Sequence, residues 1–285
     1  MPEGDTVHRT ADRLDAALRG AVLERAELRW PSVPDVDLSG SRTVEVVARG
    51  KHLLHRFDSG ATLHTHLRME GQWRVEHPGV ATERALRRHD LRAALLTERW
   101  SALGLRLGML DLVPTARESD LVGHLGPDVL GPGWDPAVAA ARLTASDALI
   151  GDALLDQRVI AGVGTFWASE ILFVERVLPW TPARDLDPAR TRRMLERLHR
   201  LMDAARRTGW QASTGIRRSG EEAYVHARSG RPCRRCGDTV RVAMTGVAPR
   251  QRTMFSCPTC QGGLAPTDDG RRQRPLGSGR RRYQA

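Results

Sequence analysis

The sequence has no asparagine, a single lysine, four cysteines and no long apolar run, and each scarcity narrows the class of protein. A membrane-spanning helix needs about 20 consecutive apolar residues, and no segment approaches that length, so we expect no membrane span. The opening MPEGDTVHRT is polar and acidic, which is unlike a signal peptide. These features predict a cytoplasmic protein whose cysteines stay reduced and need a role other than disulfides.

The single lysine is Lys51, so arginine supplies the other 43 of the 44 basic residues. Drift toward arginine should have replaced a lysine that was only a surface charge. The survival of Lys51 therefore indicates either chance or chemistry that needs a compact, titratable ammonium. The formal net charge of +10 attracts polyanions, which favours a nucleic-acid partner over a merely arginine-rich surface.

Hydrophobic periodicity divides the chain into a first helix, a strand-rich segment and a helical segment. Residues 4–19 have apolar side chains at helical spacing and stop at Gly20. Short runs separated by glycine turns predict an antiparallel sandwich or barrel; these runs are 44–47, 52–57, 61–67, 72–75 and 91–96. Helical spacing, with Asp, Ser or Pro at the starts, follows in 135–143, 146–156, 166–177 and 188–207.

These patterns predict five segments with different compositions. They are a strand-rich catalytic domain at 1–121, a linker at 122–134, a helical domain at 135–221, a cysteine-containing domain at 222–262 and a basic tail at 263–285. The tail has few apolar residues, so we expect it to be disordered and to act as a non-specific DNA tether.

The four cysteines form two Cys-x2-Cys pairs separated by 20 residues, Cys233 with Cys236 and Cys257 with Cys260. This spacing favours one tetrahedral Zn²⁺ over a redox pair or an iron–sulfur cluster. Four sulfurs leave no open position for a reacting water, so the expected ion is structural. The intervening segment is predicted to form two strands.

The turn between those two strands carries Arg250 and Arg252, which are natural phosphate contacts. A zinc ribbon by itself does not identify a function, since many nucleic-acid adaptors have one.

The first residues after Met1 suggest a nucleophile. Without the initiator methionine, Pro2 has a free secondary amine, and an α-amine has a pKa near about 7.7–8.0. The positive end of a following helix lowers that value further. A neutral amine can attack C1′ of a nucleotide and form a Schiff base, with Glu3 as acid or base. On these residues alone, simple helix capping is the favoured alternative.

Five blocks of sequence together resemble the formamidopyrimidine-DNA glycosylase / endonuclease VIII family. In the family's order they are MPEGDTV at the start, RGKHLL around Lys51, HLRMEGQWRV at 66–75, LLDQRVIAGVGTFWASEILF at 154–173 and PCRRCG…QRTMFSCPTCQ at the end. The opening PEGD is more similar to the endonuclease VIII branch. The resemblance covers residues 2 to 261 and implies an α+β fold: an N-terminal antiparallel β-sandwich with an N-terminal helix, a helix–two-turn–helix DNA-binding domain and a C-terminal zinc finger.

The resemblance also implies a bifunctional DNA glycosylase and AP lyase of base excision repair. By matching motif, Pro2 is the nucleophile, Glu3 the general acid/base, and Lys51 a ligand of phosphate or of developing charge. Arg252 corresponds to the zinc-finger arginine that grips a phosphate. The implied reaction is removal of the base followed by β- and δ-elimination through a Pro2 Schiff base.

DNA-contacting residues are implied at four further positions. His66 matches a phosphate-contacting histidine, and Met69, with its neighbour Arg68, lies in a loop that fills the space left by a flipped base. Thr165 occupies the place of the family's phosphate-binding asparagine. A hydroxyl has one donor where an amide has two, so DNA binding could be weaker than in the family.

The substrate is expected to be double-stranded DNA with a damaged base or an abasic site. The stretch LGLRLGMLDLV lacks the Arg-x-Phe pattern of the formamidopyrimidine branch, which favours oxidised pyrimidines. A monomer near the nucleoid is expected. The alternatives from other classes are a catalytically weak protein that binds lesions or abasic sites, supported by Thr165, and a zinc-ribbon adaptor, which would leave the N-terminal block unexplained.

Overall fold

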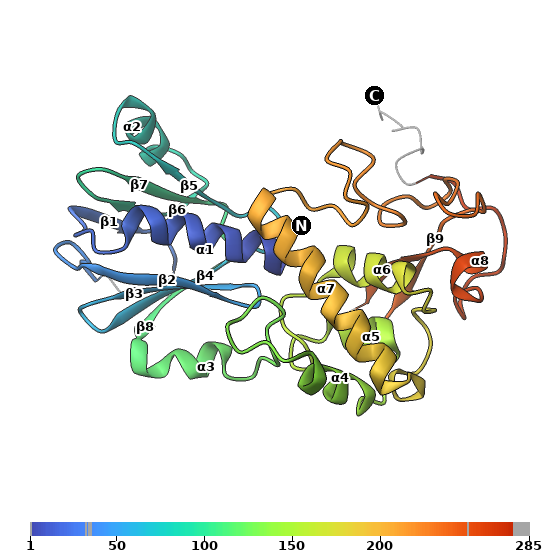
Figure 1. The fold of residues 1–285 in the computed structure, drawn as a ribbon. Helices are drawn as coiled ribbons and strands as arrows, with labels where there is room; N and C mark the ends of the chain where they lie inside the picture. The colour runs from blue at the N-terminus through green and yellow to red at the C-terminus, as the bar shows by residue number, and fades with distance from the viewer. Residues whose placement is uncertain (1, 32, 34–35, 250, 276–285) are drawn as a thin grey trace, which may run out of the picture. The chain divides into compact units, whose positions relative to one another are not determined.

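The structure is a computed structural model that describes residues 2–31, 33, 36–249 and 251–275 (Figure 1). The chain divides into two compact units, Met1–Pro132 and Gly133–Ala285, and the boundary falls inside the expected linker at 122–134. No helix among the described residues combines the length and the apolar character that crossing a bilayer requires.

Unit 1 is a β-sandwich with one long helix, as the sequence predicts. Its elements are α1 (Gly4–Leu18), β1 (Arg25–Leu28), β2 (Thr43–Arg49), β3 (His52–Phe57), β4 (Ala61–His66), β5 (Gln72–Glu76), α2 (Val80–Leu86), β6 (Leu91–Leu96), β7 (Ser101–Leu105), β8 (Met109–Pro114), η1 (Thr115–Arg117) and α3 (Glu118–Val122). Among the described residues, the strands form two four-stranded antiparallel sheets, ordered β1-β6-β7-β5 and β2-β3-β4-β8.

The core of unit 1 lies between α1 and the two sheets. Helix α1 buries Val7, Ala11, Leu14 and Leu18 at the spacing of one helical face, and it packs on β2, β3 and β5. Strand residues such as Leu53, Leu63 and Leu110 face the same cluster. Because side chains alternate along a strand, the opposite face of β2-β3-β4-β8 presents polar residues, which matters for the site below.

Unit 2 begins with helices that have clear capping signals. Its elements are α4 (Pro136–Thr144), α5 (Ile150–Leu155), α6 (Thr165–Val174), η2 (Ala183–Asp185), α7 (Pro188–Thr208), β9 (Arg241–Thr245), β10 (Arg252–Ser256) and α8 (Pro258–Gln261). Asp135 caps α4 by accepting hydrogen bonds from the Ala137 and Val138 amides, and Asp187 caps α7 by accepting from Arg190. Gly209, at φ 71°, ends α7 in the left-handed conformation.

Helix α6 is buried on nearly all sides, from Thr165 to Phe173. Its apolar composition explains this burial, since a helix without a polar face has no surface to give to solvent. Helix α6 contacts α5, α7, α8 and β10, so it is the centre of unit 2.

The last domain is a two-stranded antiparallel hairpin, β9 with β10, in which Arg252 pairs with Thr245. The tail differs from the expected disorder up to residue 275. The Gln273 side chain donates to the Val242 carbonyl and accepts from its amide, and Arg241 pairs with Asp268. These contacts replace the missing apolar packing with hydrogen bonds along β9. Residues 276–285 lie outside the described residues.

Candidate functional site

The start of α1 carries the first pair of candidate catalytic residues. Pro2 is half-buried and Glu3 is the N-cap of α1, with 1% of its surface exposed. The free N–H groups and the dipole of a helix make its first turn positive. The structure therefore places Pro2 and Glu3 together at the electropositive end of a well-packed helix, as the sequence predicts for an amine of lowered pKa.

Lys51 lies in the tight turn between β2 and β3. The preceding Gly50 has φ 60°, which glycine adopts at little cost. The Gly50 amide donates to Asp128 Oδ2 at 2.7 Å, and the same oxygen lies 3.0 Å from His8 Nε2 on α1. Asp128 thus ties the turn of Lys51 to the helix that begins beside Pro2.

Asp128 comes from the expected linker, yet it is only 3% exposed. Burial would raise the pKa of this carboxyl, but hydrogen bonds from His8, Gly50 and Leu130 outweigh burial and lower it. Asp128 is therefore a structural carboxylate that holds its charge inside unit 1.

Three histidines lie on the polar face of the sheet β2-β3-β4-β8, beside the turn of Lys51. His52 Nδ1 is 2.8 Å from His64 Nε2, and the His52 and His66 ring centroids are 5.0 Å apart. Burial lowers the pKa of His52 to about 3 and that of His66 to about 4, helped at His66 by the charges of Arg68 and Lys51. Both rings are therefore neutral at physiological pH.

The loop after β4 presents the expected DNA-contacting side chains. The Arg68 amide donates to His66 Nδ1 at 2.9 Å, so the His66 Nε2 atom carries the proton and can donate to a phosphate. The Arg68 side chain lies on Gly108, where an added Cβ would come within 2.0 Å of Arg68 Cγ. Met69 is 66% exposed, which is unusual for an apolar side chain and suits an intercalating role.

In unit 2, the turn before α6 corresponds to the predicted Gly-x-Gly motif. The Gln157 side chain accepts from the Gly162 amide and donates to the Val163 carbonyl. Gly162 has φ 96°, which explains the glycine. Thr165 is the first residue of α6 and is 9% exposed.

Arg252 lines a hollow of about 400 Å³ together with Gln157, Arg158 and Gly246. Thr245, which also lines this hollow, donates to Asp152 of α5 and so holds the hairpin against the helices. The structure therefore brings Arg252 close to the segment preceding the Gly162 turn. Arg250 lies outside the described residues.

The four cysteines form a cluster in which all Sγ atoms lie within 4.8 Å of one another. The Sγ atoms of Cys233 and Cys260 are 3.9 Å apart, and those of Cys236 and Cys257 are 3.5 Å apart. Tetrahedral Zn²⁺ at about 2.3 Å from each sulfur places the sulfurs about 3.8 Å apart. The donor set therefore fits Zn²⁺.

A second hollow in unit 2, of about 430 Å³, is lined by Phe166, Trp210, Glu222 and His226 among others. Its outer segment is anchored by the fully buried Glu170 of α6, whose carboxylate accepts from Ser213 and from three successive backbone amides, those of residues 224–226. Burial raises the pKa of Glu170 despite these donors.

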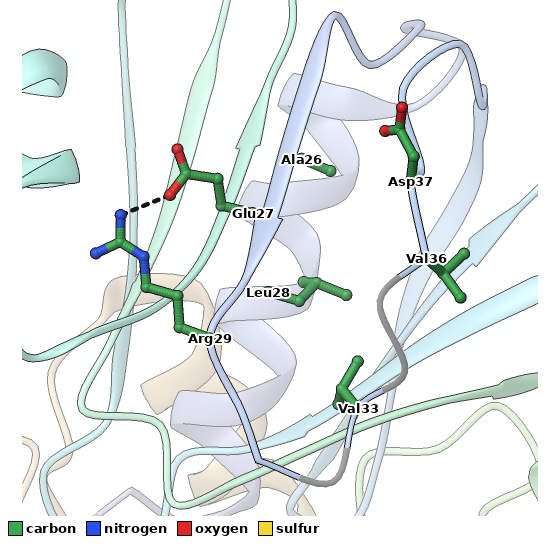
Figure 2. Close-up of a pocket in the computed structure, with 7 residues that line it drawn as sticks. All are labelled: Ala26, Glu27, Leu28, Arg29, Val33, Val36 and Asp37. Carbon is green, nitrogen blue, oxygen red and sulfur yellow. Dashed lines mark hydrogen bonds and ion pairs between the residues drawn. The ribbon is translucent and has the colours of Figure 1, made fainter.

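The pocket in Figure 2 is separate from the predicted residues. It lies against β1 and is lined by Ala26, Glu27, Leu28, Arg29, Val33, Val36 and Asp37. Glu27 pairs with Arg29 across its mouth, as the dashed line shows. It contains none of the side chains that the sequence assigns to chemistry.

The sequence prediction missed Asp128, Glu170 and the pair His64–Asp111. One signal was available: His64 and His66 are two residues apart on β4, so they share a face. The partners of the two buried carboxylates are distant in sequence, and only the fold brings them together.

Comparisons with known proteins agree with this organisation. The family model for the formamidopyrimidine-DNA glycosylase N-terminal domain matches residues 1–104, and that for the H2TH domain matches residues 125–216. A Streptomyces coelicolor protein named probable endonuclease 8 2 is 45% identical, over 95% of this chain and 98% of its own length. The Mycolicibacterium smegmatis DNA-(apurinic or apyrimidinic site) lyase Nei2 is 43% identical, over 92% of this chain and 99% of its own.

Solved structures show the same fold. The MutM (Fpg) protein of Thermus thermophilus is 31% identical and superposes with a TM-score of 0.72, over 93% of this chain and all of that one. The Lactococcus lactis formamidopyrimidine-DNA glycosylase, crystallised with DNA containing an AP site, is 22% identical with a TM-score of 0.75, over 91% of this chain and 99% of that one.

Proposed function

The chain belongs to the formamidopyrimidine-DNA glycosylase / endonuclease 8 family, and on this basis we propose that it is a bifunctional DNA glycosylase and AP lyase of base excision repair. The observation that carries the proposal is the pairing of Pro2 with the buried Glu3 at the positive end of α1, in a unit that also fixes the turn of Lys51 through Asp128. A protein that only bound DNA would not need this arrangement.

The chemistry follows from these groups. The neutral Pro2 amine attacks C1′ and displaces the damaged base, while Glu3 exchanges a proton with the sugar oxygen as the ring opens to a Schiff base. β-Elimination then breaks the bond to the 3′ phosphate and δ-elimination the bond to the 5′ phosphate. The product is a gap of one nucleotide with phosphate at both ends.

DNA is bound by groups in both units. In unit 1, His66 donates from Nε2, Lys51 supplies an ammonium, and Met69 fills the space of the extruded base. In unit 2, Arg252 and the start of α6 at Thr165 contact phosphate, since the first N–H groups of a helix point at an anion. Arg68 and Arg250 add positive charge near the strand.

The substrate base is an oxidised pyrimidine. Two observations support this preference: the relatives at 43–45% identity carry endonuclease 8 or Nei2 names, and the β7–β8 turn is only three residues long, at 106–108. Such a turn has no room for an inserted Arg-x-Phe. The protein works as a monomer near the nucleoid.

One Zn²⁺ held by Cys233, Cys236, Cys257 and Cys260 stabilises the β9–β10 hairpin and so the position of Arg252. The metal supplies cross-linking of the fold, and the reaction steps belong to the side chains of unit 1.

Borohydride trapping tests this proposal. The zinc-loaded protein, with Pro2 confirmed at its N-terminus, is incubated with a duplex that contains one abasic site or one thymine glycol. We expect a covalent adduct that peptide mapping assigns to Pro2. Since Lys51 is the only other primary or secondary amine of the side chains and terminus, mapping separates the two. No adduct on either lesion would contradict the enzyme function and leave a lesion-binding protein.

A further inference from the structure

A chain of three polar side chains crosses the outer face of the sheet β2-β3-β4-β8. Asp111 of β8 accepts from His64 Nδ1 of β4 at 2.8 Å, and His64 Nε2 is 2.8 Å from Nδ1 of His52 at the start of β3. His64 lies opposite Asp111 in the strand register, so the pairing of β4 with β8 holds this contact. The chain ends at the residue that follows Lys51.

The hydrogen bonds fix where each proton lies. A carboxylate can only accept, so the His64 proton is on Nδ1, facing Asp111. His64 Nε2 must then accept, so the His52 proton is on Nδ1 as well. His52 Nε2 is left with an unshared electron pair, at the end nearest to Lys51 and His66.

The surroundings of this chain suit proton movement between solvent and Lys51. The His64 side chain is 1% exposed and that of Asp111 is 34% exposed, so only the Asp111 end meets water freely. Burial, with the charges of the groups facing His52, lowers its pKa to about 3; these groups are His66, His64, His124 and Arg68. The ring therefore passes a proton on without retaining it.

We propose that Asp111, His64 and His52 form a proton relay that serves Lys51, and this rests on the proposed lyase function. A proton leaves Lys51 Nζ for His52 Nε2 as the His52 Nδ1 proton moves to His64 Nε2 and the His64 Nδ1 proton moves to Asp111. Each ring gains one proton and loses one, Lys51 becomes a neutral amine, and Asp111 releases the proton to water.

The neutral Lys51 amine then takes the C2′ proton of the Schiff base. The C2′–H electron pair forms the new double bond, and the C3′–O3′ bond breaks with its pair on the leaving phosphate. Lys51 is again an ammonium. A transfer in the opposite direction, ending with release of the proton from His52 Nε2 to solvent, restores both tautomers. Arginine could not do this, because its guanidinium does not lose a proton in proteins, which explains why the chain keeps a single lysine here.

The primary test compares Asp111→Asn with the wild-type full-length, zinc-loaded protein on a duplex with one abasic site. The asparagine oxygen still accepts from His64 Nδ1, but the amide cannot take up the proton. Since general acid–base catalysis contributes roughly 100- to 10,000-fold, we expect partial loss, with strand cleavage slowed about 10-fold in single-turnover experiments. The yield and rate of the borohydride adduct should be unchanged, because adduct formation precedes elimination.

Three further variants separate the relay from a structural role. His64→Gln should slow cleavage as Asp111→Asn does, and Asp111→Glu should restore it in part. His77→Gln is the matched control, since His77 stacks on Trp100 away from the cluster, and should cleave like wild type. In a Lys51→Arg background, Asp111→Asn should have no further effect on cleavage.

The opposing outcomes are equally defined. Equal slowing of adduct formation and cleavage by Asp111→Asn, unchanged cleavage, or undiminished slowing in the Lys51→Arg background would each overturn the relay. Nitrogen NMR of the histidine rings at neutral pH gives a test without DNA: a proton on Nε2 of His52 would also overturn it. Absence of any adduct with the wild-type protein is a different result, because it contradicts the lyase function itself.

Discussion

His8 Nε2 and Asp128 Oδ2 lie 3.0 Å apart, and this contact joins the helix that begins beside the nucleophile to the turn that carries Lys51. The two residues are 120 positions apart in the chain. The spacing of two reactive groups therefore depends on one buried carboxylate that reacts with nothing.

Asp128→Asn should lower the free energy of unfolding of unit 1 by about 1–3 kcal/mol, the usual cost of an unsatisfied buried group. Both carboxylate oxygens accept hydrogen bonds, from Gly50 and Leu130 among others, so either orientation of an amide opposes an N–H to an N–H. Urea titration measures the change. Asp135→Asn is the control, because asparagine caps a helix as well as aspartate does.

The same variant should alter the response to acid. The folded pKa of Asp128 is lowered, so its contribution to stability is present above the unfolded pKa of about 3.9 and is lost as pH falls through the folded value. Acidification below about pH 4 should therefore destabilise wild type more than Asp128→Asn. A parallel acid response in both proteins would contradict the assignment of Asp128 as a charged group.

Glu170→Gln should loosen the segment that outlines the hollow beside Trp210. One side of the glutamine must place its amide against backbone N–H donors, since each Glu170 oxygen accepts from at least one of them. A loss of about 1–3 kcal/mol corresponds to roughly 5- to 150-fold faster exchange of the amides of residues 224–226. Hydrogen exchange with mass spectrometry measures this, and unchanged protection in that segment would refute it. Amides of α4 serve as the internal control.

Removal of zinc should unfold the β9–β10 hairpin and leave unit 1 folded. One Zn²⁺ per chain should be released on chelation or by Cys257→Ser, and protection of Arg252–Ser256 should disappear. Re-addition of Zn²⁺, but not of Mg²⁺, should restore it in the chelated protein. A hairpin that stays protected without metal would show that the four thiolates do not hold the fold.

Arg252→Ala should weaken binding to a duplex with an abasic-site analogue by about 1–3 kcal/mol, equally for different flanking sequences. The slope of log affinity against log salt should fall by about 0.9, the release expected for one phosphate contact. Arg99→Ala is the control, because Arg99 is exposed in the β6–β7 turn far along the chain from any assigned contact. Equal effects of the two changes would leave only a general charge effect.

Met69→Ala should slow removal of a damaged base by roughly 10-fold, because extrusion costs a few kcal/mol and the side chain recovers part of it. Cleavage at a preformed abasic site should stay within about twofold, since no base remains to be extruded. Met244→Ala, a change at another exposed methionine, should affect neither rate. Equal slowing on both substrates would assign Met69 to general DNA binding.

Much of the architecture was predictable because its signals are local. Alternating strands such as His52–Phe57, and Asp135 and Asp187 followed by proline at helix starts, predict elements from neighbouring residues alone. The strand Ser101–Leu105 was missed because it is buried on both faces and so does not alternate. Helix α2 was missed because Val80–Leu86 is short.

The candidate site divides in the same way. Cysteine spacing and the Pro2–Glu3 motif are visible in the sequence, whereas the buried partners of Glu170, Asp128 and His64 depend on the register of strands and on long loops. Asp111 meets His64 only because β8 pairs with β4 across 47 residues. No local pattern marks such a pair.

The turn of Lys51 has a practical consequence for spectroscopy. Reductive methylation with ¹³C-formaldehyde labels amines, and with Met1 removed the chain offers only the ε-amine of Lys51 and the amine of Pro2. Two methyl resonances, one at each reactive group, would then report lesion binding and protonation directly. Few enzymes permit isotopic reporters at both groups of interest without a single substitution.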